Sequence, residues 1–119
     1  MKLAWTTLRV SDLERSLDFY SGLLGLGPTV RLGTSEHRVV MLGAQDSVKL
    51  ELVWEDGPIP ESGGRGVSVG LIPDDLDGAV AMLREHGCEL TGPISPDDTI
   101  RFFFVSDPDG YTVQLVEQR

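Results

Sequence analysis

Apolar and polar residues alternate at a period of two in eight short segments of the chain, the pattern of β-strands with two unlike faces. Four of these segments fall in the first half and four in the second. They are 3–10, 29–32, 37–42, 47–54, 66–72, 89–94, 99–105 and 111–116. Residues that favour turns, mainly glycine, proline, serine and aspartate, separate them. The chain is therefore predicted to be rich in short strands.

Two other segments carry apolar residues at helical spacing. The first begins after Ser11 or Asp12, either of which can cap a helix, and Ser11 with Glu14 fits a capping box. Its apolar stripe is formed by Leu13, Leu17, Phe19, Tyr20, Leu23 and Leu24, and glycine and proline at 25–28 end it. The second begins at 73–75 and has its stripe at Leu76, Ala79, Val80 and Leu83, with His86 and Gly87 at its end.

The two halves repeat one plan, a strand, a helix and three strands. Glu51 matches Gln114 at an offset of 63, and Trp5 is matched to Val67 at an offset of 62. Such a repeat predicts an α+β fold with two paired βαβββ modules that curl into an eight-stranded incomplete barrel around a cavity. The prediction is a single domain over 1–119, with module one at 1–55, a linker at 56–65 and module two at 66–119.

Glu51 is an acid in the middle of a strand that is otherwise suited to burial. An ionised carboxylate removed from water needs a partner, a metal, a proton or a wet cavity. An arginine such as Arg9 or Arg38 would give it a structural role, and a ligand cavity would give it a functional one. Both interpretations stay open from the sequence. Trp54 falls on the opposite face of this strand, which favours the core or a dimer interface.

Composition narrows the classes of partner. The 119 residues carry a net charge of −9, which disfavours nucleic acid because phosphate binding needs clustered lysine and arginine. No apolar run approaches the ~20 residues of a membrane span, so no membrane partner is expected. Cys88 is the single cysteine, which excludes an internal disulfide. We expect a cytoplasmic protein.

Two stretches resemble the vicinal oxygen chelate superfamily, which includes glyoxalase I, extradiol dioxygenases and bleomycin-resistance proteins. The opening stretch is LRVSDLERSLDFY at 8–20, followed by Gly22, Leu24 and Gly25. The closing stretch is DPDGY at 107–111, followed by VQLVE at 113–117. The resemblance covers essentially the whole chain and implies the same paired βαβββ fold that the repeat predicts.

The resemblance also implies where a divalent metal would bind, with one ligand from the first and one from the last strand of each module. Those positions are Trp5, Glu51, Val67 and Gln114. Glu51 is a good ligand and Gln114 a weak one, whereas an indole and an isopropyl group cannot ligate a metal. His37 and His86 do not fall at ligand positions. The sequence therefore predicts no metal and no other cofactor.

Apolar walls with a few convergent polar groups are typical of small-molecule pockets, and aromatic ligands stack on aromatic side chains. The predicted ligand-binding residues are Trp5, Thr7, Glu51, Val67, Phe102, Phe104 and Gln114. The leading hypothesis is a metal-independent binding protein of the bleomycin-resistance type that sequesters a bulky aromatic natural product or antibiotic. We expect a homodimer whose pockets involve both chains.

Three alternatives stay open. One is a glyoxalase-like enzyme, a metal-free lyase, isomerase or cyclase in which Glu51 is the general base. Another keeps a metal through Glu51, Gln114 and water. The third is a structural or regulatory protein with an empty pocket.

Overall fold

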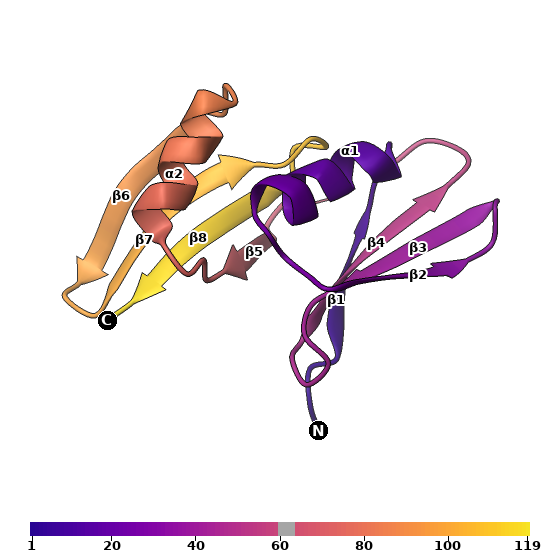
Figure 1. Ribbon diagram of the computed structural model, residues 1–119, viewed down its shortest axis with the longest axis horizontal. Helices are drawn as coiled ribbons and strands as arrows, with labels where there is room; N and C mark the ends of the chain where they lie inside the picture. The colour runs from indigo at the N-terminus through magenta and orange to yellow at the C-terminus, as the bar shows by residue number, and fades with distance from the viewer. Residues whose placement is uncertain (60–63) are drawn as a thin grey trace. The chain divides into compact units, whose positions relative to one another are not determined.

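The chain forms two compact units, Met1–Gly63 and Gly64–Arg119. The computed structural model describes residues 1–59 and 64–119. Each unit contains one four-stranded sheet and one helical segment in the order strand, helix, strand, strand, strand (Figure 1). The predicted α+β fold with two βαβββ modules is confirmed.

Unit 1 is built on a sheet with the strand order β1-β4-β3-β2. Its strands are β1 (Trp5–Arg9), β2 (Thr29–Gly33), β3 (His37–Leu42) and β4 (Lys49–Glu55). Strand β1 runs parallel to β4, and the other pairs are antiparallel. Helix α1 (Leu13–Leu17) continues as a π-helical segment, η1 (Asp18–Leu23), and together they form the crossover between β1 and β2.

The start of α1 resolves the two capping candidates. The Asp12 side chain accepts a hydrogen bond from the Arg15 backbone N–H at 3.1 Å, so Asp12 is the N-cap and the Ser11 capping box is wrong. At the other end Gly25 has a φ of +70°, the left-handed conformation that ends many helices. The predicted helix bounds are otherwise confirmed.

One face of the unit 1 sheet packs under this helix. Directly paired residues share a face of a sheet, so the register separates the two faces. The helix-covered face carries the buried residues Leu8, Val10, Val40, Leu42, Leu50 and Leu52, which pack with Leu13, Leu17, Phe19 and Tyr20. The opposite face has no helix of this unit over it and is called the open face below.

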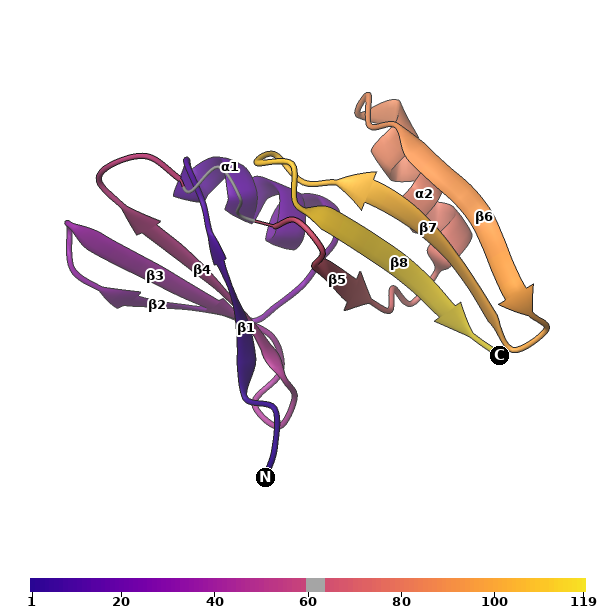
Figure 2. The ribbon, with the colours of Figure 1, turned by 180° about the vertical axis from the view of Figure 1, so that it is seen from behind.

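Unit 2 repeats the arrangement with the strand order β5-β8-β7-β6. Its strands are β5 (Ser68–Leu71), β6 (Leu90–Asp97), β7 (Ile100–Ser106) and β8 (Thr112–Gln118), and its helix is α2 (Leu76–Glu85). Leu76, Val80 and Leu83 of the predicted stripe are buried. Figure 2 shows β6, β7 and β8 in front of α2, so this sheet also has one face without a helix of its own unit.

Strand β6 is longer than predicted, since it extends past 94 to Asp97. It contains Pro93, which the predicted strand already included, and also Pro96, which lies beyond the predicted end at residue 94. An edge strand tolerates proline because one of its sides has no hydrogen-bonding partner, and β6 pairs only with β7. The register shifts twice along this pair, between Thr91 and Ile94 and between Ile94 and Asp97.

The elements of the two units fall within the predicted modules 1–55 and 66–119. The linker predicted at 56–65 includes residues 60–63, which lie outside the described residues. The single domain over 1–119 stays a prediction. No helix within 1–59 or 64–119 has the length and apolar character needed to cross a membrane.

Candidate functional site

Glu51 lies on the open face of unit 1, on the central strand β4. Its neighbours on that face are Thr7 on β1 and Met41 on β3, to which it is directly paired. The Thr7 hydroxyl donates a hydrogen bond of 2.7 Å to Glu51 Oε1. A hydroxyl group is therefore a partner of this acid. Within unit 1 this carboxylate is partly exposed, so a ligand on the open face can reach it.

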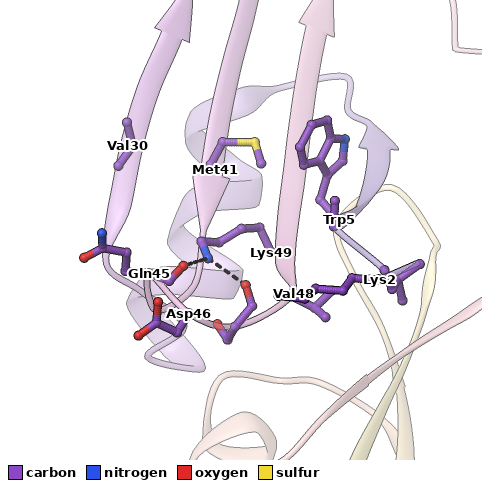
Figure 3. Close-up of a pocket in the computed structure, with 11 residues that line it drawn as sticks. Lys2, Trp5, Val30, Met41, Gln45, Asp46, Val48 and Lys49 are labelled. Atoms are coloured by element: carbon purple, nitrogen blue, oxygen red, sulfur yellow. Dashed lines mark hydrogen bonds between the residues drawn. The ribbon is translucent and has the colours of Figure 1, made fainter.

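Trp5 lies on the same open face, two residues before Thr7 on β1. It is 53% exposed, high for a large aromatic side chain. Together with Val30, Met41 and Val48 it lines a hollow of about 870 Å³ at the end of the sheet (Figure 3). This volume lies within the range of small-molecule sites, roughly 300–1,000 Å³. In Figure 3 the Met41 thioether lies between Val30 and the Trp5 indole.

The loop between β3 and β4 forms another wall of this hollow, and Lys49 holds it in place. The Lys49 ammonium donates hydrogen bonds to the backbone carbonyls of Ala44, Gln45 and Ser47, the last two at 3.0 and 2.6 Å. An ammonium has three N–H donors, so these three carbonyls satisfy it. The stem of Lys49 then lies along the floor of the hollow, as Figure 3 shows.

A charged cluster occupies the other end of the open face. The Arg9 guanidinium binds Glu55 Oε2 at 3.2 Å and the Glu55 carbonyl at 3.1 Å. His37 Nδ1 lies 2.6 Å from Glu55 Oε1. Glu55 therefore contacts both basic side chains, and its negative charge compensates the positive charge of Arg9.

Trp54 lies on the helix-covered side of unit 1, as its parity predicts. Its indole N–H donates to the Ser11 carbonyl at 3.2 Å, and the Arg38 guanidinium stacks 4.7 Å from the ring centre. These contacts place Trp54 and Arg38 away from Glu51, so both have structural roles in this unit.

The open face of unit 2 carries Gln114, the counterpart of Glu51. It is paired with Phe104 on β7 and with Gly70 on β5. Phe102 is two residues from Phe104 on the same face, and the two rings pack edge to face with their centres 5.4 Å apart. Phe102 and Phe104 share this face with Gln114, whereas Phe103 is buried on the helix side.

The match between Trp5 and Val67 is wrong by one residue. In β1 and β4, Trp5 is paired with Lys49, and in β5 and β8, Ser68 is paired with Thr112, so both strands keep an offset of 63. Ser68 therefore holds the position equivalent to Trp5, and Val67 immediately precedes β5. The sequence analysis missed Ser68 because it matched the first strands of the two halves at an offset of 62. The closing strands already gave an offset of 63.

The helix-covered side of unit 2 carries an ion-pair network away from these residues. Arg101 binds Asp77 at 3.0 Å and Glu117 at 3.1 Å. Hydrogen bonds from the Arg101 guanidinium hold the pKa of Asp77 and the pKa of Glu117 below their ordinary values, with a further contribution from Arg119 at Glu117. This network connects α2 to β7 and β8.

With Ser68 in place of Val67, the residue types at the four implied positions do not fit a transition metal. Unit 1 contributes an indole at Trp5 and a carboxylate at Glu51, and unit 2 contributes a hydroxyl at Ser68 and an amide at Gln114. Transition-metal sites use about three imidazole, thiolate or carboxylate ligands. Within 1–59 and 64–119 no group of three or more His, Cys, Asp or Glu residues is placed to hold a metal ion.

Comparison with known proteins establishes the family. Residues 2–115 match the model of the Glyoxalase/Bleomycin resistance protein/Dioxygenase superfamily, and the chain belongs to this superfamily. The lactoylglutathione lyase of Escherichia coli O157:H7 is 33% identical over 131 aligned positions, covering 100% of this chain and 94% of that protein. The lactoylglutathione lyase of Salmonella typhimurium is 34% identical over 133 positions with the same coverage.

Two solved structures represent the two kinds of relative that share this fold. The trypanothione-dependent glyoxalase I of Leishmania major superposes with a TM-score of 0.78 at 27% identity and covers 98% of this chain and 86% of its own. TnmS3, an antibiotic binding protein from Streptomyces sp. CB03234, superposes with a TM-score of 0.75 at 25% identity and covers 100% and 97%.

These relatives correct the functional prediction. The hypothesis of a metal-independent protein that sequesters an antibiotic is wrong, because the relatives at 33–34% identity over the whole chain are lactoylglutathione lyases. They likewise give no support to a metal-free, antibiotic-resistance interpretation. The error came from equating substituted metal positions with lost catalysis, although the Glu51 carboxylate can still accept a proton.

Proposed function

We propose that this chain is a glyoxalase-like enzyme, a lyase or isomerase of a small carbonyl compound, with Glu51 as its general base. The observation that carries the proposal is the position of the Glu51 carboxylate, which lies on the open face beside the Thr7 hydroxyl. The relatedness to lactoylglutathione lyases over the full chain supports this class of reaction.

The proposed chemistry is the movement of one proton between adjacent carbons. A thiol adds to a 2-oxoaldehyde to give a hemithioacetal, which is an isomer of the 2-hydroxyacyl thioester. Glu51 removes the proton from the carbon that carries sulfur, the electron pair of that bond forms a C=C double bond, and the π electrons of the neighbouring carbonyl move onto its oxygen to give an enediolate. That oxygen takes the proton of the hemithioacetal hydroxyl. The oxygen of that hydroxyl becomes the thioester carbonyl as Glu51 returns its proton to the neighbouring carbon, so no other reactant is consumed. A positioned carboxylate suits both transfers.

Thr7 has a positioning role in this proposal. Its hydroxyl donates to Oε1 of Glu51, which directs the second oxygen, Oε2, toward the substrate. In unit 2, Gln114, Phe102 and Phe104 are proposed ligand contacts, and Ser68 replaces Val67 as the residue equivalent to Trp5. The ligand is a small molecule with an aromatic or apolar part.

The Glu51→Gln variant tests the proposal. Glutamine keeps the size of the side chain and an acceptor for Thr7 but cannot take the proton, so thioester formation should fall by at least ~100-fold, the usual contribution of general base catalysis. The assay follows thioester absorbance from 2-oxoaldehydes mixed with a thiol, with a chelator and with added Mg²⁺, Ni²⁺ or Zn²⁺. Glu14→Gln is the control, because Glu14 pairs with Arg31 and both side chains are largely exposed. Turnover by Glu51→Gln at the wild-type rate would exclude Glu51 as the base.

We also propose that the chain is a homodimer with pockets that involve both chains, and that it is cytoplasmic. The exposed Val30 and Leu32 on the open face, 53% and 55% accessible, support an additional contact surface. Sedimentation velocity of wild type and of Leu32→Glu would measure the dimer and its dependence on this surface.

A further inference from the structure

The cations of the unit 1 open face are already engaged within the chain. Among the residues of β1 to β4, Arg9 and Lys49 are the lysine and arginine side chains on this face. Lys49 uses its three donors on the carbonyls of Ala44, Gln45 and Ser47. Arg9 is paired with Glu55 through both the carboxylate and the backbone carbonyl. A carboxylate of a ligand would have to displace these partners.

The rim of the hollow carries one further charge of each sign. Lys2 and Asp46, one of each sign, are the charged residues that line it beyond Lys49. The remaining lining is mainly Trp5, Val30, Met41 and Val48, which are apolar. An anionic group in this hollow would meet one opposite and one like charge at the rim and an apolar lining elsewhere, which offers it little net gain for the water that it loses.

The geometry of the hollow suits a flat apolar group. Strand β4 lies between β1 and β3, so Trp5 and Met41 stand on strands about 9.5 Å apart. A planar ring held between the two side chains needs roughly 7–8 Å between the side-chain atoms on either side of it, which is two van der Waals contact distances. The Trp5 face and the Met41 thioether are both favourable neighbours for an aromatic ring.

Unit 2, considered by itself, has an open face of the same character. The paired residues Gln114, Phe104, Phe102 and Val116 are all neutral, and so are Ser68 and Thr112. The edge-to-face pair Phe102 and Phe104 offers a second aromatic surface. Among the strand residues of the two open faces, no cluster of lysine or arginine side chains is therefore arranged to bind carboxylates.

We propose that the hollow around Trp5 binds an aromatic substituent of the substrate, and that the substrate is an adduct of a 2-oxoaldehyde with an uncharged thiol. The inference rests on the function proposed above and specifies its substrate class. Lactoylglutathione, the compound in the names of the relatives, carries the carboxylates of its peptide part. On the open face of unit 1 this chain has instead engaged Arg9 and Lys49 with its own acceptors.

A matched pair of unreactive probes tests the charge preference. N-acetyl-S-benzylcysteamine is neutral, and S-benzylglutathione carries carboxylates on the same benzyl thioether. Isothermal titration of the full chain should show the neutral probe binding at least ~10-fold more tightly, the change expected when a charged group is desolvated without a partner. Equal or tighter binding of S-benzylglutathione, or no binding of either probe, would overturn the inference.

Variants then locate the binding. Trp5→Ala should weaken binding of the neutral probe by about 10-fold, because the ring loses a stacking partner and buried area. Trp54→Phe is the control on the helix-covered side and should leave it within about twofold. Glu55→Gln should tighten binding of S-benzylglutathione several-fold, since it removes the carboxylate that engages Arg9. No change in either Trp5→Ala or Glu55→Gln would contradict the assigned site.

Turnover separates this inference from the proposed function. Phenylglyoxal is assayed with N-acetylcysteamine and with glutathione, each with wild type and Glu51→Gln. Faster Glu51-dependent conversion of the N-acetylcysteamine adduct supports both proposals. Faster conversion of the glutathione adduct overturns the substrate class and leaves the general base in place. Tight, Trp5-dependent binding of the neutral probe without turnover supports the substrate class and refutes the enzyme.

Discussion

Replacing Thr7 by valine removes one hydroxyl from the candidate site and leaves the shape of the side chain nearly unchanged. The lost interaction is the 2.7 Å hydrogen bond from the hydroxyl to Glu51 Oε1. Hydrogen bonds to charged groups contribute about 1.5–3 kcal/mol, and because Thr7 is exposed we take about 1–2 kcal/mol. If this bond orients the general base in the transition state, kcat/KM should fall by about 5- to 30-fold.

Thioester formation under the conditions used for Glu51→Gln measures this effect. Thr7→Ser keeps the hydroxyl and should retain most of the activity. Thr6→Val is the matched control, since Thr6 is the neighbouring threonine on the helix-covered face and is paired with Leu50. If Thr7→Val is as active as wild type while Glu51→Gln is inactive, the hydrogen bond does not orient the base. Equal losses in Thr6→Val and Thr7→Val would indicate a general effect on β1.

Two further predictions concern stability. Leu52→Ala and Leu115→Ala, at equivalent core positions that are 0% and 1% exposed, should each lower the free energy of unfolding in urea by about 2–5 kcal/mol. Leu32→Ala, at 55% exposure, should stay within about 0.5 kcal/mol, and small losses at both core positions would contradict the assigned packing. Because Arg101 lowers the pKa of Asp77 and Glu117 in the folded state, the stability from this network should be present at neutral pH and lost as pH falls below about 4. The difference in unfolding free energy between wild type and Arg101→Met should then shrink on acidification, and a constant difference from pH 7 to pH 3 would refute the linkage.

The fold could be predicted largely from the sequence because its strongest constraints are local. The stripe at Leu76, Val80 and Leu83 needs only helical spacing and one apolar face, and these residues are buried as expected. The alternation of faces along a strand was enough to place Trp54 on the opposite face from Glu51, and Phe103 on the opposite face from Phe102 and Phe104. The errors fall where several local solutions compete, as at the Ser11 or Asp12 cap and at Pro96 of β6.

The candidate site was harder to predict because its interactions join side chains on different strands. The partner of Glu51 depends on the register of β1 against β4, and a sequence shows which face Thr7 occupies but not what lies opposite it. The same holds for Arg9 with Glu55, which are 46 residues apart. The Lys49 ammonium holds its loop through hydrogen bonds to three backbone carbonyls. Every residue type has such a carbonyl, so the sequence does not indicate these bonds.

The repeat explains why the core residues could be predicted from the sequence and the substrate could not. At an offset of 63 the helix-covered positions keep their character, as Leu52 and Leu115 show, since each must fill space under a helix. The open-face positions have diverged, from Glu51 with its hydroxyl partner Thr7 to Gln114 beside Gly70. Because the open-face positions do not fill space under the helix of their own unit, their side chains can differ between the two modules. The difference between the open faces, more than the likeness of the cores, is therefore where the chemistry of this chain should be tested.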